Sequence, residues 1–139
     1  MRRRIVNDEP DNHCFGCSPH NPRGLRMVFQ QIDAGAIEAQ YEIGDELCGA
    51  NGVAHGGIQA TLLDEVMGMA VRGAAGNGAP LVTAEFQLRY RQPVRTRTPL
   101  TLRASVMRAE PPSYWVEASI LGPGGELLTR AEARWRRVG

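Results

Sequence analysis

Apolar and polar residues alternate along most of the chain, and this pattern predicts six β-strands. The first two strands form a hairpin around Asp33-Ala34-Gly35, and prolines or glycines punctuate the four later ones. The positions on the alternating face of the strands, all apolar except Thr129, are, in chain order, Leu25, Met27 and Phe29; Ile37, Ala39, Tyr41 and Ile43; Val82, Ala84, Phe86, Leu88 and Tyr90; Leu100, Leu102, Ala104 and Val106; Tyr114, Val116, Ala118 and Ile120; and Leu127, Thr129, Ala131, Ala133 and Trp135.

One segment between the second and third strands has a helical period instead. Residues 56–73 carry a single broad apolar face, made of Ile58, Leu62, Leu63, Val66, Met69 and Ala70. We expect the Gly- and Ala-rich residues 73–80 to end this helix and form a loop. Because one helix must cover the apolar face of an antiparallel sheet, it should lie lengthwise across that face. The exposed sheet edges favour association between subunits.

Length, charge and cysteine content narrow the class of protein. The chain has 139 residues, and we expect an irregular N-terminal segment over residues 1–24 and a single domain over residues 25–139. The formal charge of +1 gives no attraction to nucleic acid, and no apolar run approaches the ~20 residues of a membrane span. Three cysteines do not form a disulfide framework. We therefore expect a soluble cytoplasmic protein with neither a nucleic-acid nor a membrane partner.

The segment that leads into the predicted helix carries candidate chemistry. Residues 51–57 read Asn-Gly-Val-Ala-His-Gly-Gly. A helix start presents unpaired backbone N–H groups and a partial positive charge, which suits a developing oxyanion. Gly56 and Gly57 would let a carbonyl group approach the backbone closely. Asp64 follows Gly57 by two helical turns and so lies on the same face.

The helix face around Asp64 consists of small or short residues, namely Ala60, Thr61, Gly68 and Val71. Something must pack closely against such a face, and the helix of a neighbouring subunit would do so. Asp64 would then be a shielded carboxylate, the usual circumstance of a general base or nucleophile. Glu65 stands at the margin of this face beside Thr61 and Arg72, where a solvated surface patch explains it somewhat better than a catalytic role.

These residues resemble a known family. His55-Gly56-Gly57, followed by Leu62-Leu63-Asp64-Glu65, resembles the central signature of hotdog-fold thioesterases of the phenylacetic-acid-degradation type. Residues 83–93 resemble the strand after the helix in that family, and residues 13–25 resemble a segment found before the first strand in one branch of it. The resemblance spans nearly the whole chain. It implies an α+β hotdog fold in which a six-stranded antiparallel sheet wraps one long central helix.

The resemblance also implies catalytic roles. The backbone N–H of Gly56 would polarise the thioester carbonyl. His55 belongs to the same candidate catalytic group, although a lone histidine there would more often only fix the loop before the helix. Asp64 would activate water or attack the thioester directly, and both routes remain open. Thr83, at the beginning of the next strand, would help to place the water.

The residues that would contact the substrate match the family pattern less well than the catalytic residues do. Many members carry Asn or Gln six residues before the histidine, whereas this chain has Gly49 there, and Asn51 could replace it. Three arginines flank the Pro93 turn, where they would either meet coenzyme A phosphates or form a solvated loop. The candidate substrate contacts are Asn51, Gly57, Glu65, Arg91, Arg95 and Arg97.

Cysteines and histidines near the N-terminus raise the question of a metal. Cys14 and Cys17 have zinc-ligand spacing, and His13, His20 and Cys48 could complete a site. However, a second closely spaced pair is missing, and prolines follow where a redox motif would open a helix. We therefore predict no metal and no cofactor, with the cysteines packing near the pocket entrance.

The sequence thus predicts an acyl-CoA thioesterase that works as a homo-oligomer, a dimer or a dimer of dimers, with active sites at the subunit interface. One alternative is a non-catalytic module that binds or senses acyl-CoA, although pure binding has little use for the shielded acid Asp64. Another is a hotdog dehydratase or hydratase, which uses a differently spaced histidine and acid that this chain does not show.

Overall fold

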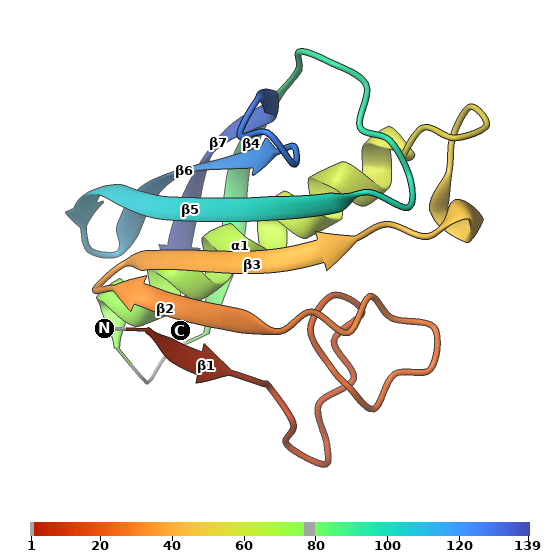
Figure 1. The fold of residues 1–139 in the computed structure, drawn as a ribbon. Helices are drawn as coiled ribbons and strands as arrows, with labels where there is room; N and C mark the ends of the chain where they lie inside the picture. Colours follow the sequence, from red (N-terminus) through yellow and green to blue (C-terminus); the bar gives the residue numbers. More distant parts are fainter. Residues whose placement is uncertain (1, 77–79) are drawn as a thin grey trace.

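A long helix, α1, lies across the concave side of an antiparallel sheet that wraps around it (Figure 1). The computed structural model describes residues 2–76 and 80–139. Its elements are β1 (Arg3–Ile5), β2 (Phe29–Asp33), β3 (Ala36–Glu42), a 3-10 turn η1 (Asp45–Leu47), α1 (Gly56–Ala75), β4 (Leu81–Tyr90), β5 (Pro99–Glu110), β6 (Ser113–Leu121) and β7 (Leu127–Arg137). The strand order is β1-β2-β3-β5-β6-β7-β4. The α+β architecture expected from the sequence, one long helix wrapped by an antiparallel sheet, is therefore confirmed.

The sheet has seven strands in the described residues, instead of the expected six. The additional strand, β1, pairs antiparallel with β2 at the sheet edge. It is three residues long and shows no apolar alternation, so periodicity could not reveal it. Arg2 beside β1 and Arg103 of β5 each place a guanidinium nitrogen 2.9 Å from the Glu38 carboxylate, which fastens this end of the chain to the sheet.

The first predicted strand is only partly a strand. Leu25 and Met27 are buried as expected, but β2 begins at Phe29. The backbone at Arg26 has a φ of 55°, which interrupts an extended strand. The backbone N–H groups of Leu25 and Met27 instead donate to carbonyls of the N-terminal segment, at 2.8 and 3.0 Å. The expected hairpin is confirmed, with Gly35 at a φ of 71° between β2 and β3.

The helix extends two residues beyond the predicted end and is followed by Gly76 at a φ of 80°. Its predicted apolar face packs into the core: Leu62, Leu63, Val66, Met69 and Ala70 are buried, and Ile58 packs against them. The predicted loop over residues 73–80 includes residues 77–79, which lie outside the described residues. None of the helices in the described part of the chain combines the length and the apolar character needed to cross a bilayer.

Strand β4 forms the far edge of the sheet and is mostly exposed on both faces. Its pairing with β7 shifts register between Thr83 and Glu85. The alternation in residues 82–90 predicts one buried face, yet Val82 is 44% exposed and Tyr90 is 55% exposed. A ten-residue edge strand with exposed apolar side chains invites pairing with another chain.

Candidate functional site

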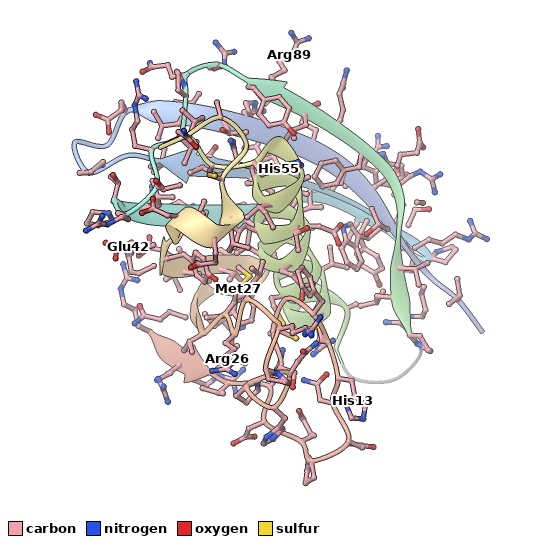
Figure 2. The ribbon with its side chains drawn as sticks, turned by 90° about the vertical axis from the view of Figure 1, so that its right-hand side faces the viewer. His13, Arg26, Met27, Glu42, His55 and Arg89 are labelled. Carbon is pink, nitrogen blue, oxygen red and sulfur yellow. The ribbon has the colours of Figure 1, made fainter. Side chains whose placement is uncertain are left out.

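The loop before α1 holds the start of the helix through a side-chain cap. His55 is the N-cap residue, and its Nδ1 accepts a hydrogen bond of 2.9 Å from the backbone N–H of Gly57. Such a cap satisfies one of the N–H groups that a helix start leaves unpaired. The N–H of Gly56, the first helical residue, belongs to the same group of donors without intrahelical acceptors. Figure 2 shows His55 at this end of α1, close to β4.

Tyr90 ties the helix start to β4. Its hydroxyl donates a hydrogen bond of 2.8 Å to the carbonyl oxygen of Gly56. A Cβ atom on Gly56 would lie 3.0 Å from the Tyr90 hydroxyl oxygen, so glycine permits this close approach. Sequence reasoning placed Tyr90 among the apolar positions of a strand and missed this contact.

A buried polar pair, Thr129 and Gln59, holds the loop before α1 from the side of the sheet. Thr129 of β7 donates a hydrogen bond of 2.7 Å to Oε1 of Gln59, and Nε2 of Gln59 donates to the carbonyl of Ala54 at 3.3 Å. Both side chains are buried, and their hydrogen bonds satisfy the polar atoms that burial would otherwise leave unpaired. The sequence feature that could have revealed this pair is the polar residue Gln59 on the buried side of the helix.

Asp64 and Thr83 are brought together by α1 and β4. The Thr83 hydroxyl donates a hydrogen bond of 2.7 Å to Oδ1 of Asp64. Asp64 is half-buried, and this burial raises the pKa of its carboxyl above 3.8, while the Thr83 hydrogen bond opposes the rise. The pair that the sequence proposed as base and water-placing residue therefore lies in direct contact.

A groove of about 490 Å³ opens beside the helix start. Gly56, Gly57, Tyr90 and Arg91 contribute to its lining. The other candidate substrate contacts lie outside that lining. Asn51 sits in an exposed turn, Arg95 is exposed in an isolated bridge with Val53, and Arg97 lies 3.6 Å from Asp45.

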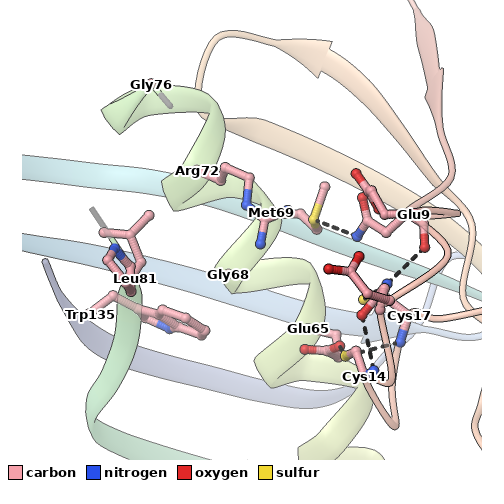
Figure 3. A pocket seen from close by; sticks show the side chains of 14 residues that line it. Glu9, Cys14, Cys17, Glu65, Gly68, Met69, Arg72, Gly76, Leu81 and Trp135 are labelled. Carbon is pink, nitrogen blue, oxygen red and sulfur yellow. Dashed lines mark hydrogen bonds between the residues drawn. The ribbon is translucent and has the colours of Figure 1, made fainter. Parts of the chain in front are cut away.

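Glu65 points away from Asp64, toward the N-terminal segment. Its Oε1 accepts a hydrogen bond of 2.9 Å from the Cys14 thiol. Burial and this hydrogen bond raise the pKa of Cys14 to about 12. The pair lines a cavity of about 510 Å³ between the N-terminal segment, α1 and the β4–β7 end of the sheet (Figure 3).

The small-residue face of α1 has a different neighbour from the one expected. A Cβ atom on Gly68 would lie 2.6 Å from the Trp135 ring of β7, and Val71 is fully buried. The chain's own sheet therefore covers this part of the helix, and the expectation that a neighbouring subunit's helix packs there is wrong for Gly68 and Val71. The small residue at position 68 makes room for an indole from the same chain.

A family model describes more than half of this chain. The thioesterase superfamily model matches residues 51–127, which include the His55 cap, Asp64 and Thr83. A curated relative, verlamelin biosynthesis protein B from a Lecanicillium species, is 55% identical over only 29 residues, or 21% of this chain and 13% of that protein.

Solved structures resemble the whole fold. A thioesterase superfamily protein superposes with a TM-score of 0.80 and 25% identity over 89% of this chain, which spans 60% of that protein's length. A putative thioesterase related to phenylacetic acid degradation, from Ralstonia eutropha, gives a TM-score of 0.74 at 26% identity, covering 81% of this chain and 85% of its own. A hypothetical thioesterase with coenzyme A from Streptococcus pneumoniae gives 0.72 at 19% identity, with 80% and 84% coverage.

The thioesterase superfamily model thus matches more than half of this chain, including the helix start and Asp64 on α1. The wrapped sheet is shared with the solved thioesterase superfamily structure. The fold is the hotdog fold, and this protein belongs to the thioesterase superfamily.

Proposed function

We propose that this protein hydrolyses acyl-CoA thioesters to a free acid and coenzyme A, with Asp64 as base or nucleophile. The observation that carries the proposal is the 2.7 Å hydrogen bond from Thr83 to a half-buried Asp64. Burial makes the carboxylate a stronger proton acceptor, and the hydrogen bond fixes the direction of its oxygen atoms. A module that only bound acyl-CoA would have no need of a positioned base.

In the general-base route, Asp64 takes a proton from water while the water oxygen attacks the thioester carbonyl carbon. The carbonyl oxygen becomes an oxyanion, which the N–H of Gly56 and the positive end of the α1 dipole stabilise. The C–S bond then breaks, and the coenzyme A thiolate leaves and takes up a proton. In the nucleophilic route, the Asp64 carboxylate itself attacks the thioester carbonyl carbon, and the C–S bond breaks as the coenzyme A thiolate leaves and takes up a proton. Water then hydrolyses the resulting anhydride to the free acid and the Asp64 carboxylate.

Gly56 and Asp64 of one chain are too far apart to act on the same carbonyl. Eight residues of α-helix separate them, which corresponds to about 12 Å along the axis. An oxyanion donor and the group that activates the attacking water must each lie about 3 Å from the reacting atoms. We therefore assign Gly56 and Asp64 of each active site to two different subunits.

The shared site requires a homodimer, and the fold offers a surface for it. Strand β4 carries Thr83 and Tyr90 and is the exposed edge of the sheet. Val82 and Tyr90 expose apolar surface on this strand, which a second copy of the chain would cover. Pairing along β4 would bring a second set of site residues close to the first.

We expect coenzyme A to bind in the groove at the helix start. The similar protein from Streptococcus pneumoniae was crystallised with coenzyme A. In this chain Gly57 and Arg91 line the groove, and a guanidinium group there suits a phosphate. Asn51, Arg95 and Arg97 lie outside the groove lining, so their contacts with substrate would involve the outer parts of coenzyme A. Glu65 would contact substrate only from the Cys14 side of α1.

The test is a thiol-release assay with a panel of acyl-CoAs that runs from short aliphatic to aromatic and long-chain groups. The wild type should release coenzyme A from at least one of them, and folded Asp64→Asn should be slower by at least ~10²-fold. Asp33→Asn, the same substitution on the exposed β2–β3 hairpin, is the matched control and should match the wild type. Saturable acyl-CoA binding without thiol release would show a binding module instead.

A further inference from the structure

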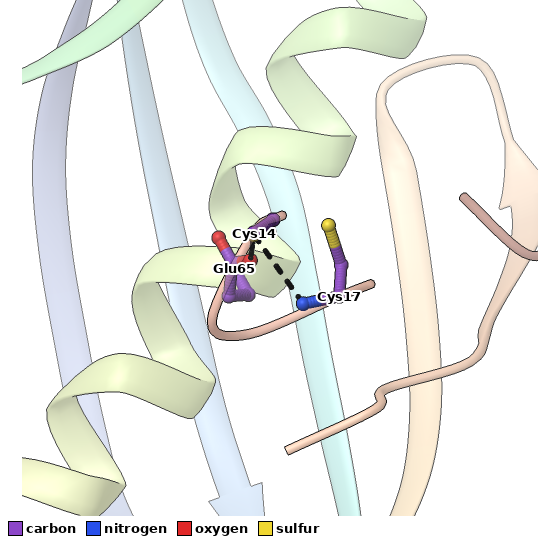
Figure 4. Close-up of side chains that lie close together, drawn as sticks. All are labelled: Cys14, Cys17 and Glu65. Carbon is purple, nitrogen blue, oxygen red and sulfur yellow. Dashed lines mark hydrogen bonds between the residues drawn. The ribbon is translucent and has the colours of Figure 1, made fainter. Parts of the chain in front are cut away.

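Three metal-binding donors lie together where the N-terminal segment meets α1 (Figure 4). The Sγ atoms of Cys14 and Cys17 and a carboxylate oxygen of Glu65 all lie within 4.8 Å of one another. In a tetrahedral zinc site, bonds of about 2.3 Å to sulfur and about 2.0 Å to oxygen separate neighbouring donors by roughly 3.5–4 Å. The three donors therefore need only small side-chain rotations to reach one cation.

The loop that carries the two thiols is held in place by its own hydrogen bonds. Oδ1 of Asn12 accepts a hydrogen bond of 3.0 Å from the Cys14 N–H, and the buried Ser18 hydroxyl donates to the Asn12 carbonyl at 2.7 Å. The Cys17 N–H donates to the Cys14 sulfur at 3.4 Å. Backbone N–H groups directed at sulfur stabilise a metal-bound thiolate, as outer-shell donors do in metal sites.

The buried Gly16 lets Glu65 reach this loop. A Cβ atom at Gly16 would lie 2.2–2.4 Å from the Cγ, Cδ and Oε1 atoms of Glu65. Any larger residue at position 16 would push the carboxylate away from both sulfur atoms. The loop and the helix thus approach as closely as a third donor requires.

The donors open onto the cavity of about 510 Å³ described above. Glu9 and Asp11 line the same cavity but lie outside the group of three donors, so a water molecule in the cavity would supply the fourth ligand that zinc usually takes. Arg72 also lines it and offsets part of the negative charge of two thiolates and a carboxylate. Figure 3 shows Arg72 on α1 on the same side as Glu65.

We propose that Cys14, Cys17 and Glu65 bind a divalent thiophilic cation of the Zn²⁺ class. Two thiolates and one carboxylate suit Zn²⁺ better than the harder Mg²⁺ or Ca²⁺, which take oxygen donors. The cation would fasten the N-terminal segment to α1 at the residue next to Asp64. When no cation is bound, the Cys14 thiol donates a hydrogen bond to Glu65, and cation binding releases the thiol protons of both Cys14 and Cys17 to solvent.

The sequence alone argued against this site because it lacked a second pair of donors beside the CxxC. The missing donor comes from the middle of α1, and only the fold brings it to the cysteines. The histidines that sequence reasoning offered do not join the cluster: His13 is exposed, and Nε2 of His20 hydrogen bonds to the Asp8 carbonyl at 2.8 Å.

Cobalt provides a spectroscopic test on the full chain. Protein reduced with a phosphine and stripped of metal is titrated with Co²⁺, and the thiolate-to-cobalt charge-transfer absorption in the near ultraviolet is followed. We expect saturation at one equivalent per chain and loss of the signal when Zn²⁺ displaces the cobalt. A titration with no charge-transfer absorption would overturn the proposal.

Matched variants assign the ligands. Cys14→Ser and Cys17→Ser should each weaken Co²⁺ binding by at least about 100-fold, because loss of an outer-shell partner alone costs 10–100-fold. Glu65→Gln should weaken it by at least about tenfold. Cys48→Ser removes the remaining free thiol, which lies outside the cluster, and should bind as the wild type does. Equal loss in Cys48→Ser, or none in the other variants, would contradict the assignment.

Alkylation of the wild type keeps the test decisive if a variant fails to fold. Iodoacetamide labelling followed by peptide mapping should show Zn²⁺ protecting Cys14 and Cys17 but not Cys48. Protection of no cysteine, or of Cys48 alone, would overturn the site. Neither the cobalt titration nor the alkylation experiment depends on thioester hydrolysis. A negative result in either would therefore overturn the cation site without testing the proposed thioesterase activity.

Discussion

The Thr83 hydroxyl donates a hydrogen bond of 2.7 Å to Oδ1 of Asp64. The two residues lie on different elements, an edge strand and the central helix, so the contact depends on how the sheet wraps around α1. The hydrogen bond orients a carboxylate whose pKa burial has raised. Two opposing effects therefore act on one acid, and each can be altered separately.

Replacing Thr83 by valine should raise the pKa of Asp64 further, because the hydrogen bond that favours the ionised form is lost. The acid limb of the kcat/KM profile should move to higher pH than in the wild type, and kcat should fall less than in Asp64→Asn. The matched control is Thr101→Val on β5, whose hydroxyl bonds to Gln40 at 3.1 Å. An unchanged acid limb in Thr83→Val would show that Asp64 does not control the rate.

Asp64 should also make stability depend on pH. Because its folded-state pKa lies above the unfolded value of 3.8, the protonated form stabilises the fold below that value, and this contribution is lost as the pH rises through the folded-state pKa. Ionised Asp64 is thus destabilising at neutral pH. In urea unfolding, Asp64→Asn should be more stable than the wild type at pH 7, and the difference should shrink toward pH 4. A variant less stable than the wild type at pH 7 would contradict this.

The N–H of Gly56 can be removed with little change to the backbone. Proline is favoured at the first helical position, and the preceding residue, His55, already has a ψ of 135°, which a following proline tolerates. Gly56→Pro should lower kcat by about 10²–10³-fold, as loss of an oxyanion donor does. Gly56→Ala keeps the N–H but adds the same Cβ near Tyr90, so it separates the donor from crowding. Equal losses in the two variants would rule out the Gly56 donor.

The smallest active unit should be a homodimer. Sedimentation velocity should show a dimer at micromolar concentration, and Val82→Asp on the exposed β4 edge should shift the equilibrium toward monomer and lower activity in parallel. Met107→Asp places the same charge at an exposed apolar position on β5 and serves as the control. A stable, fully active monomer at nanomolar concentration would exclude a site shared between subunits.

Sequence periodicity was sufficient for the elements that build the fold. The apolar face of α1 and the alternation in β3, β5, β6 and β7 predicted most of the buried residues, because each pattern repeats within one element, but Tyr41, Val106 and Leu127 are only partly buried. It was not sufficient for β1, which is too short to show a pattern and is held by pairing with β2 and by the Arg2–Glu38 ion pair.

In the candidate site, too, the sequence was sufficient for residues within one segment but not for contacts between distant elements. Asp64, Gly56 and His55 belong to one continuous segment, and a resemblance to a family was enough to select them. The contacts of Tyr90 with Gly56, Trp135 with Gly68 and Glu65 with Cys14 join elements far apart in the chain. Such contacts depend on strand register, including the shift between β4 and β7, which local spacing does not encode.

The most direct test of the account is a subunit-mixing measurement with the two active-site variants. Asp64→Asn and Gly56→Pro homodimers, each nearly inactive, are mixed, allowed to exchange subunits and assayed for coenzyme A release. If Gly56 and Asp64 of one site come from different subunits, each mixed dimer contains one intact site, and activity should recover to about a quarter of the wild-type rate, because random exchange makes half of the dimers mixed and each has one of its two sites. No recovery despite verified subunit exchange would contradict the shared site and, with it, the proposed arrangement of base and oxyanion donor.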